Sequence, residues 1–315
     1  MLMQGYDDAI ALPIGAASEL TRNNPRLLKL SKIYEGMHLP VNTRSAWNMQ
    51  RMDASLNLSH FRGQNAYIWQ YIDWPRTTIL KYYIFAQYVH SFDRDRLLEQ
   101  LGEDGAFGCW TFSYPGLPVV SRDLLDSVNE IIFLDNHLGI LRRAGLRVLD
   151  IGAGFGRLAY RMSQAVRDLA DYCCVDAIPE STFLCEYYTH YRNCPPAVRV
   201  LPLHELDSGL SARGFDLVVN IHSFSECTYE AVAWWAKHLQ RLRIPNLLII
   251  PNEPTELLST EILRSGETKA ARRDFRPLIE GAGYELRICE PVLNDPATRE
   301  LVNIHDHFHL FTLRD

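Results

Sequence analysis

One stretch, from Arg147 to Tyr160, constrains the fold of this chain more than any other. It reads Arg-Val-Leu-Asp-Ile-Gly-Ala-Gly-Phe-Gly-Arg-Leu-Ala-Tyr. Its first apolar residues predict a short strand that is covered on both faces, as in a parallel sheet. Leu158, Met162 and Val166 recur at helical spacing, which predicts that a helix follows directly. Between strand and helix, three glycines leave the turn with little side chain, so a ligand can approach its backbone.

The positions of Gly152, Gly154 and Gly156 indicate what kind of ligand this turn would bind. The free N–H groups and the positive dipole end of the following helix favour a nucleotide cofactor. A purely structural turn between strand and helix would need one glycine at most. The dinucleotide pattern Gly-x-Gly-x-x-Gly has its third glycine one position later, where this chain has Arg157. The spacing therefore disfavours NAD.

The run Asp150-Ile-Gly-Ala-Gly-Phe-Gly156 resembles the first motif of the class I methyltransferases. Members of that family bind S-adenosylmethionine (SAM) and release S-adenosylhomocysteine (SAH). The resemblance, which extends over about half of the chain, implies an α/β fold with a doubly wound, Rossmann-like sheet of seven mostly parallel strands, the last one antiparallel. It also implies that Gly152, Gly154 and Gly156 bind SAM.

The order of the predicted elements after the glycine turn supports a parallel sheet, because strands and helices alternate. We expect residues 1–144 to form a mainly helical cap, acceptor-binding or oligomerisation region, and residues 145–315 to form the SAM-binding domain. One helix should begin at Pro75 and another should be capped by Ser121. Further strands are expected at 172–176, 198–201, 215–220, 246–251, 284–292 and 306–313, with helices at 181–191 and 229–243 and a long helix ending at Gly281.

Aromatic residues crowd the segment from Phe61 to Tyr88. Their helical spacing predicts packing in a core or at the face of a homo-oligomer formed by these N-terminal helices. Tyrosine and tryptophan also suit a carbohydrate or another hydroxylated acceptor, because they combine an apolar ring with a polar tip. Residues 61–67 are the candidates for acceptor contacts, with a helix cap as the alternative.

Composition excludes several classes of partner. The chain has 32 basic and 38 acidic residues, a formal net charge of −6, and no basic run, so nucleic acid is not an expected partner. Its seven cysteines form no Cys-x-x-Cys pair and suit reduced thiols, which favours the cytoplasm. The first residues carry acid where a signal peptide is basic, and no apolar run approaches the roughly 18 residues of a membrane span. We expect neither export by that route nor a membrane span.

Cofactor contacts are expected where strands end, since ligands of open parallel sheets bind at the carboxyl edge. Asp176 lies twenty residues after Gly156, close to the spacing at which an acid binds both ribose hydroxyls; the alternative is a helix N-cap. Asp150 is expected to brace the glycine turn through backbone N–H groups, near the amino-acid end of SAM. In the family's layout, Leu203 would form an apolar wall beside the adenine.

The end of the fourth strand, Asn220-Ile-His222-Ser-Phe-Ser-Glu226, brings four polar side chains to the place where the methyl group should be transferred. It resembles the corresponding segment of a group of sugar O-methyltransferases from polysaccharide and natural-product pathways, which have Asn-x-x-Ser-Phe-x-Glu at this point. The resemblance implies a sugar hydroxyl as acceptor, on a nucleotide-sugar, a glycoside or a glycan. It also places Asn220 near the cofactor.

A sugar hydroxyl is a poor nucleophile until it loses its proton, and a well-placed base typically adds a factor of about 10² to 10⁴ in rate. His222 is the first candidate for that base, and Glu226 would orient it or accept the proton itself. Alternatively, His222 only packs beside SAM and Glu226 caps the helix that begins near Thr228.

Two further questions concern metals and rival functions. His305 and His307 alternate on a predicted strand, but no carboxylate cluster accompanies them, so no metal site is expected. The nearest rival function is methylation of another small molecule at oxygen or nitrogen. A scaffold that binds SAM or a partner without turnover is a second rival, and a dehydrogenase is a third.

Overall fold

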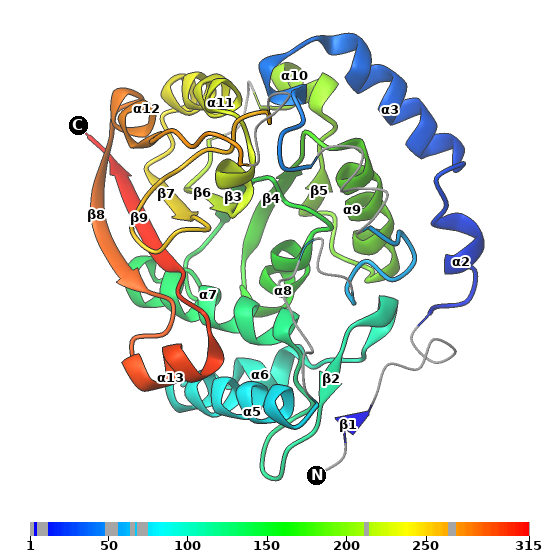
Figure 1. Ribbon diagram of the computed structural model, residues 1–315, viewed down its shortest axis with the longest axis vertical. Coiled ribbons are helices and arrows are strands. Elements are labelled where there is room, and N and C mark those ends of the chain that lie inside the picture. Colours follow the sequence, from blue (N-terminus) through cyan, green and yellow to red (C-terminus); the bar gives the residue numbers. More distant parts are fainter. Residues whose placement is uncertain are drawn as a thin grey trace.

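A seven-stranded sheet runs through the centre of the protein in the computed structural model (Figure 1). The structure describes residues 3–4, 12–47, 56–63, 67, 75–210, 214–263 and 269–314. The strand order is β5-β4-β3-β6-β7-β9-β8, and β9 alone runs antiparallel to both of its neighbours. This arrangement is the class I methyltransferase sheet, so the predicted fold class is confirmed. The strands are β3 (Leu146–Ile151), β4 (Leu169–Val175), β5 (Val198–Val200), β6 (Leu217–Ile221), β7 (Asn246–Ile250), β8 (Tyr284–Pro291) and β9 (His307–Leu313).

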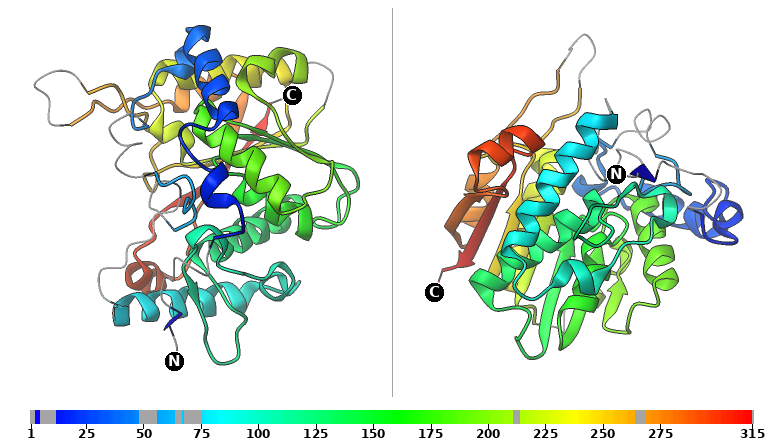
Figure 2. Two further views of the ribbon diagram at one scale, coloured as in Figure 1. Left: turned by 90° about the vertical axis from the view of Figure 1, so that its right-hand side faces the viewer. Right: turned by 90° about the horizontal axis from the view of Figure 1, so that it is seen from below.

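Helices cover both faces of this sheet (Figures 1 and 2). None in the described ranges is long and apolar enough to cross a membrane. The α-helices are α2 (Ala16–Glu19), α3 (Pro25–Met37), α5 (Pro75–Phe92), α6 (Leu97–Leu101), α7 (Arg122–Leu138), α8 (Arg157–Ala165), α9 (Pro179–Tyr191), α10 (Leu206–Leu210), α11 (Tyr229–Leu242), α12 (Arg276–Gly281) and α13 (Pro296–Val302). Short 3-10 turns are η1 (Pro40–Asn42), η2 (Ala106–Gly108), η3 (Leu203–Glu205) and η4 (Ser223–Glu226), and β1 (Met3–Gln4) pairs with β2 (Thr111–Phe112).

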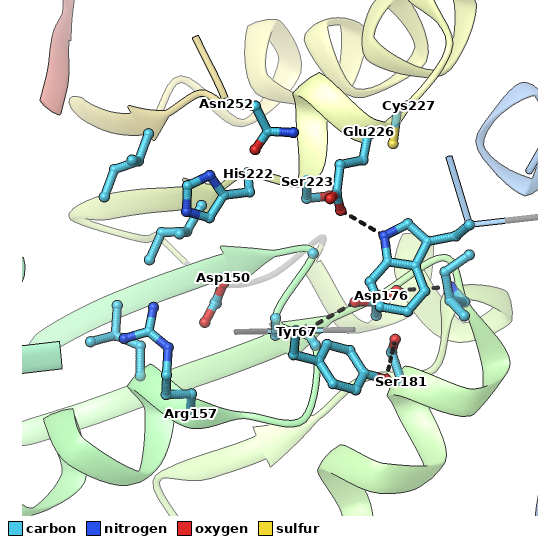
Figure 3. A pocket seen from close by; sticks show the side chains of 18 of the residues that line it. Tyr67, Asp150, Arg157, Asp176, Ser181, His222, Ser223, Glu226, Cys227 and Asn252 are labelled. Atoms are coloured by element: carbon cyan, nitrogen blue, oxygen red, sulfur yellow. Dashed lines mark hydrogen bonds between the residues drawn. The ribbon is translucent and has the colours of Figure 1, made fainter. Parts of the chain in front are cut away.

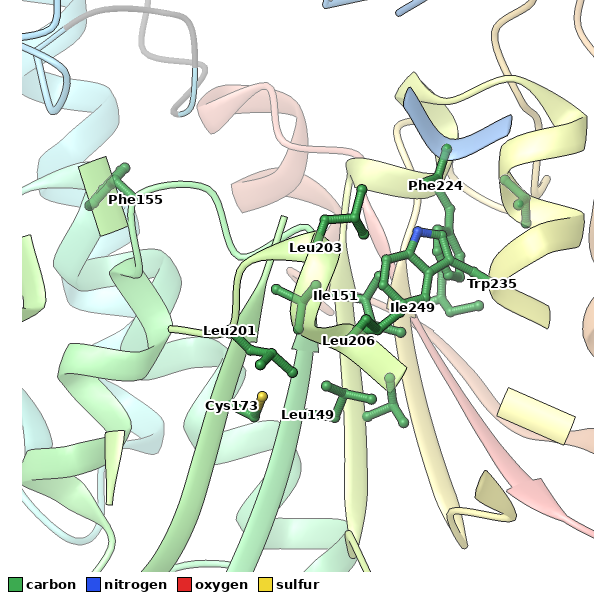
Figure 4. Packing of buried hydrophobic residues seen from close by; sticks show 14 of the residues in the cluster. Leu149, Ile151, Phe155, Cys173, Leu201, Leu203, Leu206, Phe224, Trp235 and Ile249 are labelled. Atoms are coloured by element: carbon green, nitrogen blue, oxygen red, sulfur yellow. The ribbon is translucent and has the colours of Figure 1, made fainter. Parts of the chain in front are cut away.

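Alternation along the strands divides the apolar interior into two cores. Leu149 and Ile151 point to one face with Phe224 and Trp235, as Figure 4 shows. Val148 belongs to the other core, as expected when successive side chains of a strand point to opposite faces. Both faces of the sheet are therefore covered by apolar side chains and shielded from water, which explains why the strands have continuous apolar sequences.

The N-terminal helices contribute to the same two cores as the sheet. Leu30 of α3 belongs to the first core and Phe85 of α5 to the second. Helix α5 begins at Pro75, as predicted, and packs against α7 and α13. Because both cores contain residues from either side of position 144, the two predicted regions share their hydrophobic interior; the division at that position stays a prediction.

Capping residues set the starts of the helices beside the site. The Ser121 side chain accepts the Leu124 N–H and begins α7, as predicted. Thr228 accepts the Ala231 N–H and begins α11, so the cap of that helix is Thr228 and not Glu226. These bonds satisfy N–H groups that a helix start would otherwise leave unpaired.

The long helix expected before Gly281 is wrong, because Arg276–Gly281 is the only helix among the residues described between β7 and β8. Within the described residues, the chain after β7 forms an extended arm: Leu258 bridges Asp274, and the Ser259 N–H donates to the Arg273 carbonyl at 2.9 Å. The side chain of Thr260 donates to the Ser225 carbonyl at 2.7 Å. These hydrogen bonds hold the arm against η4 in an extended conformation.

Candidate active site

A cavity of about 360 Å³ opens at the carboxyl edge of the sheet. Strand ends from β4 to β9 line it, together with the N-terminal segment 41–47 and the first turns of α7. Several of its side chains, including those of Asp150, Asp176, His222 and Glu226, are drawn in Figure 3. The cavity lies where open α/β sheets bind their ligands, at the edge where the chain leaves the strands.

The glycine turn forms the floor of this cavity. Gly152, Gly154 and Gly156 have φ angles of 77°, 57° and 85°, a conformation that favours glycine. A Cβ on Gly152 would lie 2.2 Å from the Ser223 side chain, and one on Gly154 would lie 3.1 Å from the Tyr67 ring. A ligand lying along the turn would therefore contact Ser223 and Tyr67 as well as the backbone.

Asp176 follows β4 and braces the turn. One carboxylate oxygen accepts the Gly154 N–H at 3.0 Å, and the other accepts the Ile178 N–H at 2.8 Å. Burial raises the pKa of Asp176 to about 7, although the two N–H donors oppose the shift. Asp176 also lines the cavity. A carboxylate oxygen accepts more than one hydrogen bond, so the group retains capacity for ligand hydroxyls.

Asp150, at the end of β3, does not make the bracing contact expected of it. Its carboxylate accepts the hydroxyl of Tyr172 at 2.9 Å, and the N–H of Gly154 goes to Asp176 instead. Burial raises the pKa of Asp150 to about 7 against the opposing effects of Tyr172 and Arg157. Asp150 lines the cavity beside the turn.

Two ion pairs line the cavity. Arg157 binds both carboxylate oxygens of Glu130, at 2.8 and 2.9 Å, and Arg122 binds Asp126 at 2.6 and 2.7 Å. No sequence pattern predicted this grouping, and Arg157 was identified only as the residue that breaks the dinucleotide pattern. The i,i+4 spacing of Arg122 and Asp126 on a helix could have shown the second pair.

His222 has two features typical of a functional residue. Its backbone lies in the left-handed region at φ 61°, which costs of order 1 kcal/mol or more for a side chain other than glycine. Its Nδ1 atom is buried and has no hydrogen-bond partner among the described residues. The N–H of His222 donates to the Ile250 carbonyl at 2.7 Å, which ties the strained residue to β7. A buried nitrogen without a partner suits a ligand that supplies one.

Glu226 holds the N-terminal segment over the cavity. The indole N–H of Trp47 donates to its carboxylate at 2.6 Å, and the hydroxyl of Ser45 donates to its backbone carbonyl at 2.8 Å. The Trp47 and Tyr67 rings lie 5.1 Å apart, and the Tyr67 hydroxyl bonds Ser181. The sequence analysis singled out Tyr67 within residues 61–67, but it did not predict Trp47 or its contact with Glu226.

Three other predicted cofactor residues lie outside the cavity lining. Asn220 is fully buried and donates to the Ile151 carbonyl at 2.7 Å while it accepts the Phe224 N–H at 3.0 Å. Leu203 is packed in the first core, and Gly156 lies against Cys185. The structure therefore gives Asn220 the task of joining β3 to the turn that carries Ser223 and Phe224.

Residues 61–67, the candidates for acceptor contacts, divide in the structure. Tyr67 lines the cavity, whereas Arg62 is fully buried among acidic residues; Gln64 and Asn65 lie outside the described residues. No group of three His, Cys, Asp or Glu side chains in the described ranges could hold a metal ion. His305 lines the cavity rim, and His307 is not part of the lining.

No family model and no curated protein matches the chain. Solved structures with a related fold include a SAM-dependent methyltransferase from Aquifex aeolicus, 17% identical, covering 59% of this chain and 88% of its own, with a TM-score of 0.40. Magnesium protoporphyrin IX methyltransferase from Synechocystis PCC 6803, with bound SAH, is 14% identical, covering 74% of this chain and 100% of its own, with a TM-score of 0.42. A 1,6-didemethyltoxoflavin N1-methyltransferase from Burkholderia thailandensis is 16% identical, covering 76% of this chain and 90% of its own, with a TM-score of 0.39. Likeness at this level does not bear on the acceptor.

Proposed function

We propose that this protein is a SAM-dependent methyltransferase that methylates a hydroxyl of a sugar or of a glycosylated small molecule. The observation that carries the proposal is the glycine turn between β3 and α8: it has three left-handed glycines, two of which line the cavity, and it is braced by Asp176 at the end of β4. The sheet order and the antiparallel β9 agree with it. The sugar acceptor rests on the likeness of Asn220, Ser223, Phe224 and Glu226 to the sugar O-methyltransferase pattern.

The residues of the cavity fit SAM. Gly152 has no room for a Cβ, Asp176 has acceptor capacity for ribose hydroxyls, and Asp150 lies beside the turn as an acceptor for an ammonium group. Arg157 adds positive charge, suited to a carboxylate. When bound, SAM would supply a methyl group on a sulfonium leaving group that is already activated.

The task left to the chain is to position the acceptor and to remove its proton. The strained backbone of His222 fixes its imidazole at the cavity, between the glycine turn and β7. In our proposal, this imidazole accepts the proton of the attacking hydroxyl, since a neutral imidazole has one ring nitrogen that can take a proton. The carboxylate of Glu226 already accepts the Trp47 N–H, so we assign it to closing the site and only secondarily to proton transfer.

Two variants of one residue test this mechanism. His222→Ala should leave SAH affinity nearly unchanged and lower turnover at least tenfold, because it removes the base and not the cofactor floor. His222→Gly removes the same imidazole but suits the left-handed backbone, so it should be equally slow and no less stable. The assay is methyl transfer from labelled SAM in fractionated cell extract, followed by identification of the labelled acceptor.

Each alternative has its own outcome in that assay. Unchanged turnover in both variants removes His222 from the mechanism. Recovery of activity in the glycine variant alone would show that the alanine variant failed through its backbone. Labelled product that is not a sugar would leave a methyltransferase of another small molecule. Tight SAH binding with no labelled product would support a binding scaffold.

A further inference from the structure

The cavity is longer than the part that the proposed cofactor residues occupy. Asp176 and the glycine turn follow β4 and β3, but the lining continues past His222, which follows β6, to the ends of β7, β9 and β8. From β4 to β9 there are four strand spacings, which is about 19 Å. The far part, which we call the second chamber, is lined by Arg122, Asp126, Ile221, His222, Ile250, Asn252, Val292, Ile304, Asp306 and Phe308.

The wall of the second chamber is held firmly by the N-terminal half of the chain. Val292 donates its N–H to the Asp306 carbonyl at 2.8 Å, and the buried Asn129 side chain of α7 donates to the Val292 carbonyl at 2.8 Å. The Phe308 ring stacks on Phe133 of α7 with their centres 4.1 Å apart. The connection from β8 to β9 is therefore fixed in position by its contacts with α7.

Both signs of charge are present in the second chamber. Arg122 is paired with Asp126, which is four residues further along α7. Burial lowers the pKa of Arg122, but the carboxylates of Asp126 and, less strongly, Asp306 raise it, and the net shift is upward. The Asp306 side chain thus lies in the field of Arg122, yet it makes no hydrogen bond or ion pair within the described part of the chain.

These groups discriminate between classes of acceptor. A carboxylate would lie beside Asp126 and Asp306 and meet like charge, and Arg122 already has Asp126 as its counter-ion. A hydroxyl meets no like charge and can donate to a carboxylate or an amide oxygen. The remaining walls are apolar and exclude water from the polar contacts. They are formed by Ile221, Ile250, Val292, Ile304 and Phe308.

We propose that the second chamber binds the acceptor, that Asp306 and Asn252 accept hydrogen bonds from its hydroxyl groups, and that the acceptor is a hydroxyl-bearing molecule without negative charge. This inference rests on the proposed function, because it takes the glycine turn as the place of the cofactor. It adds the class of the acceptor and a specificity-determining residue, Asp306, that lies far from the glycine motif in the sequence.

The test uses three probes that differ in one group: methyl glucoside, the corresponding methyl glucuronide and the corresponding methyl glucosaminide. Their binding to the full-length protein loaded with SAH is measured by saturation-transfer NMR. We expect the glucuronide to bind most weakly of the three. Asp306→Asn should weaken binding of the glucoside at least fivefold and leave SAH affinity unchanged, because it removes a charged acceptor of hydrogen bonds and keeps the shape.

Glu300→Gln is the matched control, since this exposed carboxylate of the same connection lies outside the cavity lining. It should bind the glucoside like the unaltered protein. Binding of the glucuronide as strong as that of the glucoside, absence of glucoside binding, or equal glucoside binding by Asp306→Asn overturns the proposal. Failure of SAH itself to bind the unaltered protein is a different result, and it rejects the proposed function.

Discussion

Buried carboxylates occur in two settings in this molecule, and the contrast separates structure from function. In the first, which we call the ion cluster, Glu103 and Asp123 lie between Arg62 and Arg161 at distances of 2.7 to 3.1 Å, with all four side chains almost fully buried. In the second, Asp150 and Asp176 line the cavity and take their hydrogen bonds from uncharged groups.

The pKa shifts run in opposite directions in these two settings. Burial by itself would raise the pKa of Glu103 and Asp123, but Arg62 and Arg161 hold both pKa values below their ordinary range. Burial raises the pKa of Asp150 and Asp176 to about 7, because no cation compensates fully. The ion cluster therefore joins Arg62 of the N-terminal region to α7 and α8. Asp150 and Asp176, which lack a fully compensating cation, can still accept hydrogen bonds from a ligand.

The largest expected effect comes from breaking the ion cluster. Arg161→Met should lower the free energy of unfolding by ~3–5 kcal/mol, since two buried carboxylates would keep only Arg62. Urea unfolding followed by circular dichroism measures it. Arg142→Met, which removes an exposed pair with Asp95, is the control and should cost no more than ~1 kcal/mol. Equal losses in the two variants would contradict the distinction between the settings.

An intermediate effect is expected in the pH dependence of stability. A carboxyl whose folded pKa exceeds its unfolded value binds protons more tightly when folded, so its contribution to stability falls as pH rises from about 4 to about 7. Asp150→Asn keeps an acceptor for Tyr172 and removes this titration. The variant should flatten the slope by up to ~1.4 kcal/mol per pH unit in that range. Unfolding curves at pH 5, 6 and 7 with an unchanged slope would show that Asp150 is not destabilised by burial.

The smallest effect concerns Glu226, a cavity carboxylate held by the neutral donor Trp47. A double-mutant cycle of Trp47→Phe and Glu226→Gln should give a coupling of ~1 kcal/mol in the free energy of unfolding, as for a partly exposed hydrogen bond. A coupling indistinguishable from zero would mean that this contact does not hold the segment 41–47 in place.

The sequence predicted the fold well because its determinants are local. The apolar run before Gly152, the cap at Ser121 and the start at Pro75 each act within a few residues. The segment before Gly281 was predicted wrongly because its own sequence does not show the contact of Thr260 with Ser225. A bond between distant segments outweighed the local pattern there.

The candidate site was predictable only in part for the same reason. The glycines, Asp176 and His222 follow from motif and strand order. Asp176, and not Asp150, braces the glycine turn, because its carboxylate is the one that reaches the Gly154 N–H. The position of Asn220 depends on its hydrogen bond to the Ile151 carbonyl. The contact of Trp47 with Glu226 joins residues 179 positions apart, and no pattern in either segment indicates it.

The most direct test of the account is isothermal titration of SAH into the full-length protein at pH 8, with Asp176→Asn beside it. We predict one SAH bound per chain. We also predict at least tenfold weaker binding by the variant, because hydrogen bonds to a charged group contribute about 1.5–3 kcal/mol. Absence of SAH binding by the unaltered protein, or equal affinity in the two proteins, would contradict the assignment of the glycine turn and Asp176 as the cofactor site.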